Sequence, residues 1–316
     1  MELYLGIDVG SVSTNLVLID ENNNVHESLY LRTKGQPIRV LKEGMQILKE
    51  KFENQVTIKG VGTTGSGRYL AGVIVGADIV KNEITAHAIA TTTFHPEVQT
   101  IIEIGGQDSK IILIRNGVVT DFAMNTVCAA GTGSFLDQQA SRLNIPIEQF
   151  GDLALKSTVP VRIAGRCTVF AESDMIHKQQ LGYKVEDIIN GLCEALVRNY
   201  LNNVGKNKEI LPPVVFQGGV AANRGIREAF SKALGQDIIV PKYFNVMGAI
   251  GAAILAKEAV NDKTTNFKGF KVADFNFETR SFECTYCPNH CEIAEISEEG
   301  KVIGRWGGRC PRWEVV

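Results

Sequence analysis

Short apolar runs separated by polar, glycine-containing turns occur twice along the chain in the same order. Each set predicts three β-strands, and the sets begin near Leu3 and near Thr100. The predicted strands are Leu3–Asp8, Asn15–Ile19 and Val25–Leu31 in the first set, and Thr100–Ile104, Ile111–Arg115 and Val118–Met124 in the second. A repeat at this separation indicates two related domains rather than a solenoid.

Helical patterns and further strands lie between and after these two sets. The predicted helices are Ile38–Phe52, Ile79–Thr92, Val169–Leu181, Val185–Val204 and Met247–Ala259, and the other predicted strands are Val56–Val61, Pro213–Phe216 and Ile238–Val240. Gly62–Gly67 predicts a turn after the strand that precedes it. The small residues of Met247–Ala259 predict close contact between this helix and a sheet. The whole pattern predicts an α/β fold.

Three polar turns contain residues that are suited to binding a nucleotide. Asp8–Thr14 joins two strands of the first set, and Gly105–Lys110 has the corresponding place in the second. Glycine lets the backbone approach a phosphate, which backbone N–H groups can then surround, and two such turns facing each other would hold a nucleotide. Asp8 can hold magnesium through water, although an ordinary polar hairpin explains its turn equally well. The adjacent glycines of Gln217–Asn223 can lie flat against a base or ribose.

Two cysteines each come just before a predicted helix. Cys128 lies in Asn125–Asp137 and is followed by a helix-like run to Leu143, and Cys167 lies in Arg166–Ser173. A helix N-terminus carries unpaired N–H groups and partial positive charge, which favour a thiolate or an anionic cluster held by thiolates. Two thiolates per chain are half of a four-cysteine iron–sulfur site. The hypothesis is that two copies of the chain share one cluster; the alternative is two small buried core residues.

Composition narrows the class of protein. The 316 residues suffice for two domains, and the net charge of -2 gives no general attraction to nucleic acid or to a membrane. No apolar run reaches the roughly 18 residues of a membrane span, and the N-terminus lacks the pattern of a secretory signal. We therefore expect a cytoplasmic protein whose seven cysteines are ligands or thiols rather than disulfides. Cys193, within a predicted helix, is expected in the core.

The remaining four cysteines are close together near the end of the sequence, with the spacing Cys284-x2-Cys287-x3-Cys291-x18-Cys310. Glu292–Ile296 and Lys301–Trp306 predict a hairpin between the third and the fourth. Four cysteines so spaced indicate a metal site. Zinc held beside a hairpin and a second iron–sulfur cluster both fit the pattern. His290 can replace one ligand, but a surface histidine is the simpler interpretation.

Four motifs in this order, IDVGSVST, IEIGGQDSK, CAAGTGSFLD and FQGGVAAN, resemble a known superfamily. They are similar to the two RNase H-like domains of the acetate and sugar kinase, heat-shock chaperone and actin (ASKHA) superfamily. VCAAGTGSFLD and RCTVFAESD resemble more narrowly the activators of 2-hydroxyacyl-CoA dehydratases in the BadF/BadG/BcrA/BcrD family, which includes benzoyl-CoA reductase ATPase subunits. The resemblance covers about residues 1–260 and is closest to ATP-dependent reductases of double-cubane cluster proteins.

The resemblance implies a role for individual residues. Cys128 and Cys167 would bind one [4Fe–4S] cluster between the two chains of a homodimer, and Asp8, Gln107 and Asp108 would act at the magnesium ion or the attacking water. The residues that would surround ATP or ADP are Gly10, Ser11, Val12, Ser13, Thr14, Gly105, Gly106, Gln107, Gly131, Thr132, Gly133, Gly218, Gly219, Val220 and Asn223. Asn15 stands where many kinases of the superfamily have lysine, so no cationic phosphate contact is implied there.

The implied function is ATP hydrolysis coupled to low-potential electron transfer under anaerobic conditions. The acceptor would be a partner iron–sulfur protein of the dehydratase or double-cubane type, and the donor a ferredoxin- or flavodoxin-like protein. The resemblance places one subdomain at residues 1–95, completed by about 236–262, a second at 96–235, and a cysteine-rich segment at 263–316. One alternative is a sugar kinase that uses Glu103 or Asp121 as its base. Another is a nucleotide-controlled binding module without turnover.

Overall fold

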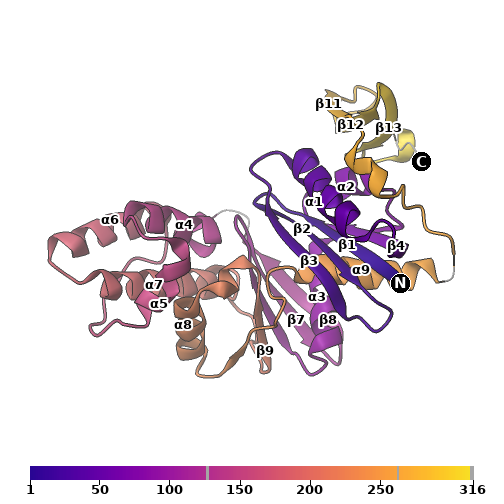
Figure 1. Cartoon of the computed structure of the whole chain (residues 1–316). Coiled ribbons are helices and arrows are strands. Elements are labelled where there is room, and N and C mark those ends of the chain that lie inside the picture. Colours follow the sequence, from indigo (N-terminus) through magenta and orange to yellow (C-terminus); the bar gives the residue numbers. More distant parts are fainter. Residues whose placement is uncertain (126–127, 262, 314–316) are drawn as a thin grey trace. The chain divides into compact units, whose positions relative to one another are not determined.

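A computed structural model describes residues 1–125, 128–261 and 263–313 of the chain (Figure 1). Residues 126 and 127 of the predicted cysteine stretch lie outside these ranges, as do residue 262 of the first predicted subdomain and residues 314–316 of the cysteine-rich segment. The chain forms two compact units. Unit 1 comprises Met1–Ala86 and Gly248–Val316, and unit 2 comprises His87–Met247.

Each unit contains a five-stranded mixed sheet. In unit 1 the order is β3-β2-β1-β4-β5, where β1, β2 and β3 pair antiparallel and β1, β4 and β5 pair parallel. Unit 2 has the same arrangement in the order β10-β9-β6-β7-β8. The strands are β1 (Glu2–Val9), β2 (Ser13–Ile19), β3 (Val25–Arg32), β4 (Thr57–Thr64), β5 (Ile79–Val80), β6 (Thr100–Ile104), β7 (Ser109–Arg115), β8 (Val118–Met124), β9 (Val214–Gln217) and β10 (Ile238–Ile239). The predicted repeat and the α/β fold are confirmed.

Helices cover these sheets and supply much of each apolar core. The long ones are α1 (Pro37–Phe52), α2 (Arg68–Val75), α3 (Glu83–Phe94), α4 (Gly133–Arg142), α5 (Ile147–Ala154), α6 (Thr168–Gln180), α7 (Val185–Asn203), α8 (Arg224–Leu234) and α9 (Met247–Val260). A Cβ atom at Gly6 of β1 would lie 1.8 Å from the Ala249 carbonyl oxygen of α9. The close contact predicted between this helix and a sheet is therefore confirmed.

Two sequence predictions were wrong near β4. Residues 62–64, predicted as part of a turn, belong to β4, and Ile79–Val80, predicted as helix, form β5, so α3 begins only at Glu83. The reason is packing rather than turn formation, because a Cβ at Gly62 would lie 2.1 Å from the Ala252 carbonyl oxygen of α9. A glycine within a strand here makes room for a helix backbone.

A third, antiparallel sheet follows α9 and consists of β11 (Phe277–Glu283), β12 (Glu292–Glu298) and β13 (Lys301–Trp306). Its β12–β13 hairpin confirms the prediction, whereas β11 was not predicted. The sheet packs on unit 1, where Ile296 joins the apolar core that contains Leu41 and Val75. A Cβ at Gly304 would lie 2.7 Å from a methyl carbon of Val73 on α2.

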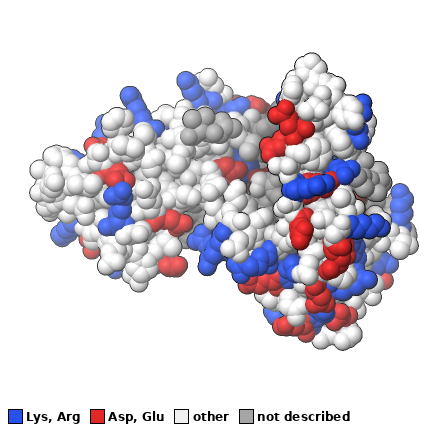
Figure 2. Space-filling view, turned by 90° about the horizontal axis from the view of Figure 1, so that it is seen from above, with Lys and Arg blue, Asp and Glu red and all other residues white. Residues whose placement is uncertain are grey.

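The charged side chains of the surface are mixed in sign. Figure 2 shows Lys and Arg interspersed with Asp and Glu over the visible face, in keeping with the net charge of -2. No helix in the described ranges is both long and apolar enough to cross a membrane.

Candidate functional site

The turn between β1 and β2, residues 10–13, forms the first loop. The Gly10 N–H donates to the Ser13 carbonyl at 2.8 Å, so only Ser11 and Val12 form its tip. Thr33 fixes the loop from one side, because its N–H donates to the Val12 carbonyl at 2.8 Å and its hydroxyl to the Gly10 carbonyl at 2.9 Å. Among the described residues, the N–H groups of Ser11 and Val12 have no acceptor. The loop thus presents backbone donors, as a phosphate site requires.

Oxygen atoms flank Asp8 on both neighbouring strands. Asp8 is in register with Asn15 of β2 and with Thr64 of β4, which places the three side chains on one face of the sheet. Asn15 Oδ1 and Thr64 Oγ1 are buried and lack a hydrogen-bond partner within the described part of the chain. Magnesium takes oxygen ligands, commonly one or two carboxylates together with waters. These residues therefore fit the magnesium ion that the sequence predicts at Asp8.

A glycine with positive φ lies against the first strand of each sheet. A Cβ at Gly65, whose φ is +91°, would lie 2.4 Å from the Val9 carbonyl oxygen and 2.5 Å from Asp8 Oδ1. A Cβ at Gly218, whose φ is +89°, would lie 2.4 Å from the Ile104 carbonyl oxygen and 2.6 Å from a Glu103 carboxylate oxygen. Only glycine fits either position, since both the backbone conformation and the space exclude a side chain.

The turn between β6 and β7, residues 105–108, forms the second loop and is closed in the same way as the first. The Gly105 N–H donates to the Asp108 carbonyl at 3.0 Å, which leaves Gly106 and Gln107 at the tip. For the N–H groups of these two tip residues, the described part of the chain supplies no acceptor. The predicted phosphate residues of both motifs therefore share one backbone geometry.

The second loop is bonded to the N-terminus of α4. The Gly133 N–H donates to the Gly105 carbonyl at 2.9 Å, and the Ser134 N–H and hydroxyl donate to the Gly106 carbonyl at 2.8 and 2.6 Å. The first N–H groups of a helix are otherwise unpaired. Here they hold the loop, so that loop and helix form one hydrogen-bonded body.

A buried lysine lies beneath the second loop. Lys110 Nζ lies 2.7 Å from Asp108 Oδ2 and 3.1 Å from Glu103 Oε2. Both Lys110 and Glu103 are almost completely buried. Asp121, on the edge strand β8, pairs with Lys208 at 2.5 Å. The two carboxylates suggested as the base of a sugar kinase are thus both engaged in ion pairs.

A neutral histidine, which sequence reasoning missed, is bonded to Gln217, the register neighbour of Glu103. The Gln217 side chain joins Thr91, whose hydroxyl donates to it at 2.9 Å, to His87 Nδ1 at 2.9 Å. Burial, reinforced by the positive charge of Lys110, lowers the pKa of His87 to about 3. His87 is therefore uncharged near neutral pH. Its place within a run of small helical residues gave no sign of this role.

The third predicted turn forms a 3₁₀ helix, Gly219–Ala222, before α8. Asn223 Oδ1 accepts the Ile226 N–H at 3.0 Å and so caps α8, while its Nδ2 is buried with no partner in the described ranges. Val220 is buried. The binding of adenosine by these residues stays a prediction, although the Asn223 amide retains donors for a ligand.

The structure brings the Cys128 and Cys167 segments together in unit 2. Cys128 Sγ lies 3.5 Å from the carbonyl oxygen of Arg166, the residue that precedes Cys167. Asn199 of α7 joins the two segments, since its Nδ2 lies 3.4 Å from Cys128 Sγ and donates to the Gly165 carbonyl at 2.7 Å. Both cysteines are partly exposed. Asn199 was not identified from the sequence.

Each of these cysteines precedes a helix, as predicted. Cys128 occupies the N-cap position of a 3₁₀ helix, Ala129–Gly131, and Cys167 that of α6. Thr132 bonds back to the Ala129 carbonyl at 2.7 Å, and a Cβ at Gly131 would lie 2.8 Å from Asn199 Oδ1. Two accessible thiols, with a side-chain N–H directed at one sulfur, form a donor set that fits half of an iron–sulfur cluster.

Comparison with known proteins matches residues 5–256 to the model of the BadF/BadG/BcrA/BcrD ATPase family. The chain belongs to this ATPase family. It is 38% identical over 264 residues to the (R)-2-hydroxyglutaryl-CoA dehydratase activating ATPase of Acidaminococcus fermentans, a match that covers 81% of this chain and 98% of that protein. The resemblance to this family and to its dehydratase activators, inferred from the motifs, is confirmed.

Solved structures agree with the family assignment. The activator of the 2-hydroxyisocaproyl-CoA dehydratase from Clostridium difficile, with bound ADPNP, is 33% identical with a TM-score of 0.75, over 83% of this chain and 97% of that chain. A ROK family glucokinase from Streptomyces griseus, in complex with glucose and AMPPNP, is 14% identical with a TM-score of 0.51, over 81% of this chain and 99% of the kinase. At that identity the likeness shows the fold alone, which is the predicted kinase-type fold.

The cysteine-rich tail lies beyond the part that matches the ATPase family. Cys284 is buried, Cys291 is partly buried, and Cys287 and Cys310 are exposed. The Cys284 N–H donates to the Cys291 carbonyl at 2.8 Å. Within the described ranges, no three His, Cys, Asp or Glu side chains are gathered as metal ligands. The metal site of the tail therefore stays a prediction.

Two further features bear on the remaining cysteine and histidine predictions. His290 Nδ1 lies 2.6 Å from a Glu283 carboxylate oxygen, so this ring is engaged in a surface pair. The Trp313 side chain and the Tyr286 N–H lower the pKa of the Cys284 thiol. Cys193 is fully buried, and burial raises its pKa to about 12, as expected for a core thiol.

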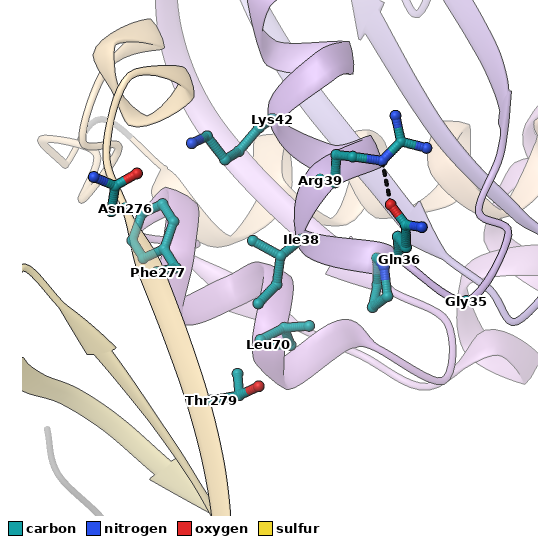
Figure 3. A pocket seen from close by; sticks show the side chains of 10 residues that line it. Gly35, Gln36, Ile38, Arg39, Lys42, Leu70, Asn276, Phe277 and Thr279 are labelled. Carbon is teal, nitrogen blue, oxygen red and sulfur yellow. Dashed lines mark hydrogen bonds between the residues drawn. The ribbon is translucent and has the colours of Figure 1, made fainter.

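Unit 1 also contains a cavity of about 520 Å³ between the start of α1 and β11 (Figure 3). Ile38, Leu70 and Phe277 supply apolar side chains, and Arg39 and Lys42 supply positive charge. Both cations already have partners, since Arg39 donates to Gln36 and Lys42 donates to the Phe275 carbonyl at 2.6 Å. None of the lining residues is among those predicted to bind the nucleotide.

Proposed function

We propose that this protein is an ATP-dependent activator of a partner iron–sulfur protein. It hydrolyses ATP and couples hydrolysis to low-potential electron transfer. The observation that carries the proposal is a continuous hydrogen-bonded connection in unit 2. The second loop is bonded to the N-terminus of α4, and the segment just before α4 contains Cys128, which Asn199 joins to the Cys167 segment. The dehydratase activators named among the relatives support this activity.

Binding of ATP is assigned to the two loops. The tip N–H groups of residues 10–13 and 105–108 receive phosphate oxygens, because these donors have no acceptor in the described chain, while the Val12 and Gly106 carbonyls are held by Thr33 and Ser134. Asp8, Asn15 and Thr64 hold the magnesium ion, which neutralises phosphate charge during hydrolysis. Gln107 and Asp108 orient the attacking water. No covalent nucleophile is needed in this chemistry.

Cys128 and Cys167 of two chains hold one [4Fe–4S] cluster, because each chain supplies two of the four thiolates. When bound, the cluster supplies a one-electron carrier at low potential. Asn199 directs an N–H group at the Cys128 sulfur, and hydrogen bonds to sulfur tune such a potential. This ligand count supports the proposed homodimer.

The effect of ATP binding is transmitted to the cysteines through α4. A shift of the Gly105 and Gly106 carbonyls moves Gly133 and Ser134, and hence the short 3₁₀ helix that begins just after Cys128. The nucleotide can bias this movement only by the difference in its affinity for the two arrangements. The acceptor is a dehydratase-type or double-cubane cluster protein, and the donor is a ferredoxin- or flavodoxin-like protein.

The four tail cysteines bind zinc or a second iron–sulfur cluster in this proposal. Their spacing supports it, as does the Cys284 N–H bond to the Cys291 carbonyl, which draws two of the four segments together. A sugar kinase is the weaker candidate, because Lys110 and Lys208 already hold the carboxylates that would serve as its base.

The test is metal analysis and turnover on the full chain purified without oxygen. We expect ATP hydrolysis, and about two irons per chain from the shared cluster or about six if the tail holds a second one. Cys128→Ser should lose the shared iron and partner reduction, whereas Cys193→Ala, which changes a buried thiol of the same unit, should retain both. Zinc that disappears in Cys287→Ser would identify the tail metal.

Two results would contradict the proposal. Iron retained in both Cys128→Ser and Cys167→Ser would remove the cluster assignment. Phosphorylation of a sugar by an iron-free protein would favour the kinase.

A further inference from the structure

The two units place different side chains at equivalent positions. Gly10 and Gly105 close their loops through the same N–H to carbonyl bond, three residues along the chain. In register with Asp8 stands Asn15, and in register with Glu103 stands Lys110. The equivalence is supported by the positive-φ glycines, which contact the strand carrying each acid in the same way.

Ser13 and Asp108 are equivalent by the same loop closure, because each supplies the carbonyl that accepts the glycine N–H. Unit 1 therefore has an amide and a hydroxyl where unit 2 has an ammonium and a carboxylate. Asn15 Oδ1 lacks a partner within the described residues, whereas Lys110 Nζ binds two carboxylates. A cation is thus built into the protein in unit 2, at a position where unit 1 presents oxygen atoms.

Burial determines which part of the ion cluster is fixed and which part faces a ligand. The side chains of Lys110 and Glu103 are 2% and 6% exposed, whereas that of Asp108 is 38% exposed. A buried ammonium is stable only when it is paired, and Glu103 provides a permanent partner. Lys110 therefore holds the Asp108 carboxylate from the buried side, while part of the Asp108 side chain remains exposed at the loop.

We propose that Lys110 is a positioning residue, an internal cation that fixes the Asp108 carboxylate in the second loop, so that Asp108 orients the attacking water and does not bind the metal ion. The inference rests on the proposed ATP hydrolysis. It assigns the magnesium ion to the oxygen atoms of unit 1 alone. Removal of Lys110 should then lower the rate of hydrolysis without weakening the binding of nucleotide or magnesium.

The experiment compares variants of the full chain, purified without oxygen. Lys110→Met should lower kcat for ATP hydrolysis by about tenfold or more, because a misplaced catalytic group loses its orientation, with KM for ATP and the half-saturating Mg²⁺ concentration unchanged within about twofold. Lys110→Arg should recover part of kcat, since a guanidinium can bind both carboxylates. Lys208→Met, which breaks an ion pair on β8 in the same unit, should leave kcat unchanged.

A further variant separates folding from positioning. Lys110→Met alone removes the ammonium that pairs with the buried Glu103 carboxylate, which destabilises the protein. The double variant Glu103→Gln/Lys110→Met removes both charges, so the melting temperature should recover while kcat stays low.

Three outcomes would overturn the inference. They are an unchanged kcat in a folded Lys110→Met protein, a kcat restored in the double variant, and a roughly tenfold rise in the Mg²⁺ requirement, which would make Lys110 a support of the metal site. In each of these the wild-type chain still hydrolyses ATP, so the proposed function stands. A wild-type chain without hydrolysis would overturn the proposed function and this inference together.

Discussion

Unit 1 and unit 2 share a strand order but differ in the side chains that flank the first strand of each sheet. In unit 1, Asp8 has Asn15 and Thr64 as register neighbours, and oxygen atoms of both neighbours lack partners within the described residues. The site is polar, and these two oxygen atoms are available to a ligand. Such a site fits a cation that arrives with a ligand.

In unit 2 the same positions are filled by Glu103, Lys110 and Gln217, and they satisfy one another or the neighbouring helix α3. The second loop is also bonded to α4, while the first is bonded to the end of β3 through Thr33. The comparison shows that the same strand order supports two different sets of polar contacts. In unit 1 two buried oxygen atoms have no partner among the described residues, whereas in unit 2 the lysine is paired with two carboxylates and the loop is bonded to α4.

Acid should distinguish the two units most strongly. His87 of unit 2 has a pKa of about 3, below its usual 6.5, so the unfolded chain binds a proton more readily than the folded one. Its contribution to stability is complete above pH 6.5 and is lost as the pH falls toward 3, by roughly 4–5 kcal/mol in total. Unfolding by urea between pH 3 and 7, with hydrogen exchange to resolve the units, measures this loss. His87→Gln should flatten the pH dependence of unit 2, and an unchanged slope would contradict the assignment.

The glycines against β1 and β6 should respond alike, because the scaffold is duplicated there. Gly65→Ala and Gly218→Ala should each lower the free energy of unfolding by about 2–4 kcal/mol, through strain and collision with backbone oxygen. Gly235→Ala is the matched control, because Gly235 also has positive φ but no atom within 4 Å of an added Cβ. Its cost should be about 1 kcal/mol. Equal costs at all three positions in denaturant unfolding would show that space is not the deciding factor.

The hydroxyl bonds that hold the two loops should separate binding from coupling. Thr33→Val and Ser134→Ala each remove one side-chain bond to a loop carbonyl and should cost about 1 kcal/mol of stability. Only Ser134→Ala should reduce the electrons delivered per ATP hydrolysed, because within the described residues the second loop, and not the first, is bonded to the helix that follows Cys128. Partner reduction and phosphate release, measured together, give this ratio. If the ratio fell equally in Thr33→Val, the claim that only the second loop is coupled to electron transfer would be wrong.

The smallest effect is expected at the helix that follows each positive-φ glycine. Asn223 caps α8 of unit 2 through its side chain, whereas Gly67 at the start of α2 in unit 1 has none to offer. Asn223→Ala should cost about 1 kcal/mol and Asn223→Ser almost nothing, since serine is also a good cap. If the Asn223 amide contacts the nucleotide, both variants should bind it more weakly in titration calorimetry. Affinity that follows stability alone would assign Asn223 to capping only.

The sequence predicted those features that local pattern carries. Apolar runs located nearly all the strands and revealed the repeat. Cys128 and Cys167 were identified as candidate ligands because each comes just before a predicted helix. Residues 62–64 were assigned to a turn because glycines within a strand look the same as glycines in a turn. What distinguishes them is the approach of α9, which lies far away in the sequence. The strand β11 was missed because most of its residues are polar or charged and face solvent.

The unpredicted part of the candidate site depends on contacts between residues distant in the chain. Asn199 bonds to Cys128 across 71 residues, and Gln217 bonds to His87 across 130. The ion pair of Lys110 with Glu103 depends on the register of β6 and β7, which places the two residues opposite each other. Composition and spacing carry no information about such pairings, so these contacts can be identified only in the folded chain.

The small sheet that follows α9 has a practical consequence for anyone who shortens this protein to match its relatives. Phe270, Val272 and Ile296 complete the apolar core beneath α1 and α2, yet all three come after residue 256, where the family match ends. A chain truncated there would expose the apolar side chains of those helices to solvent. The truncated protein should aggregate when expressed, even though every residue proposed to bind ATP and both cysteines, Cys128 and Cys167, are still present.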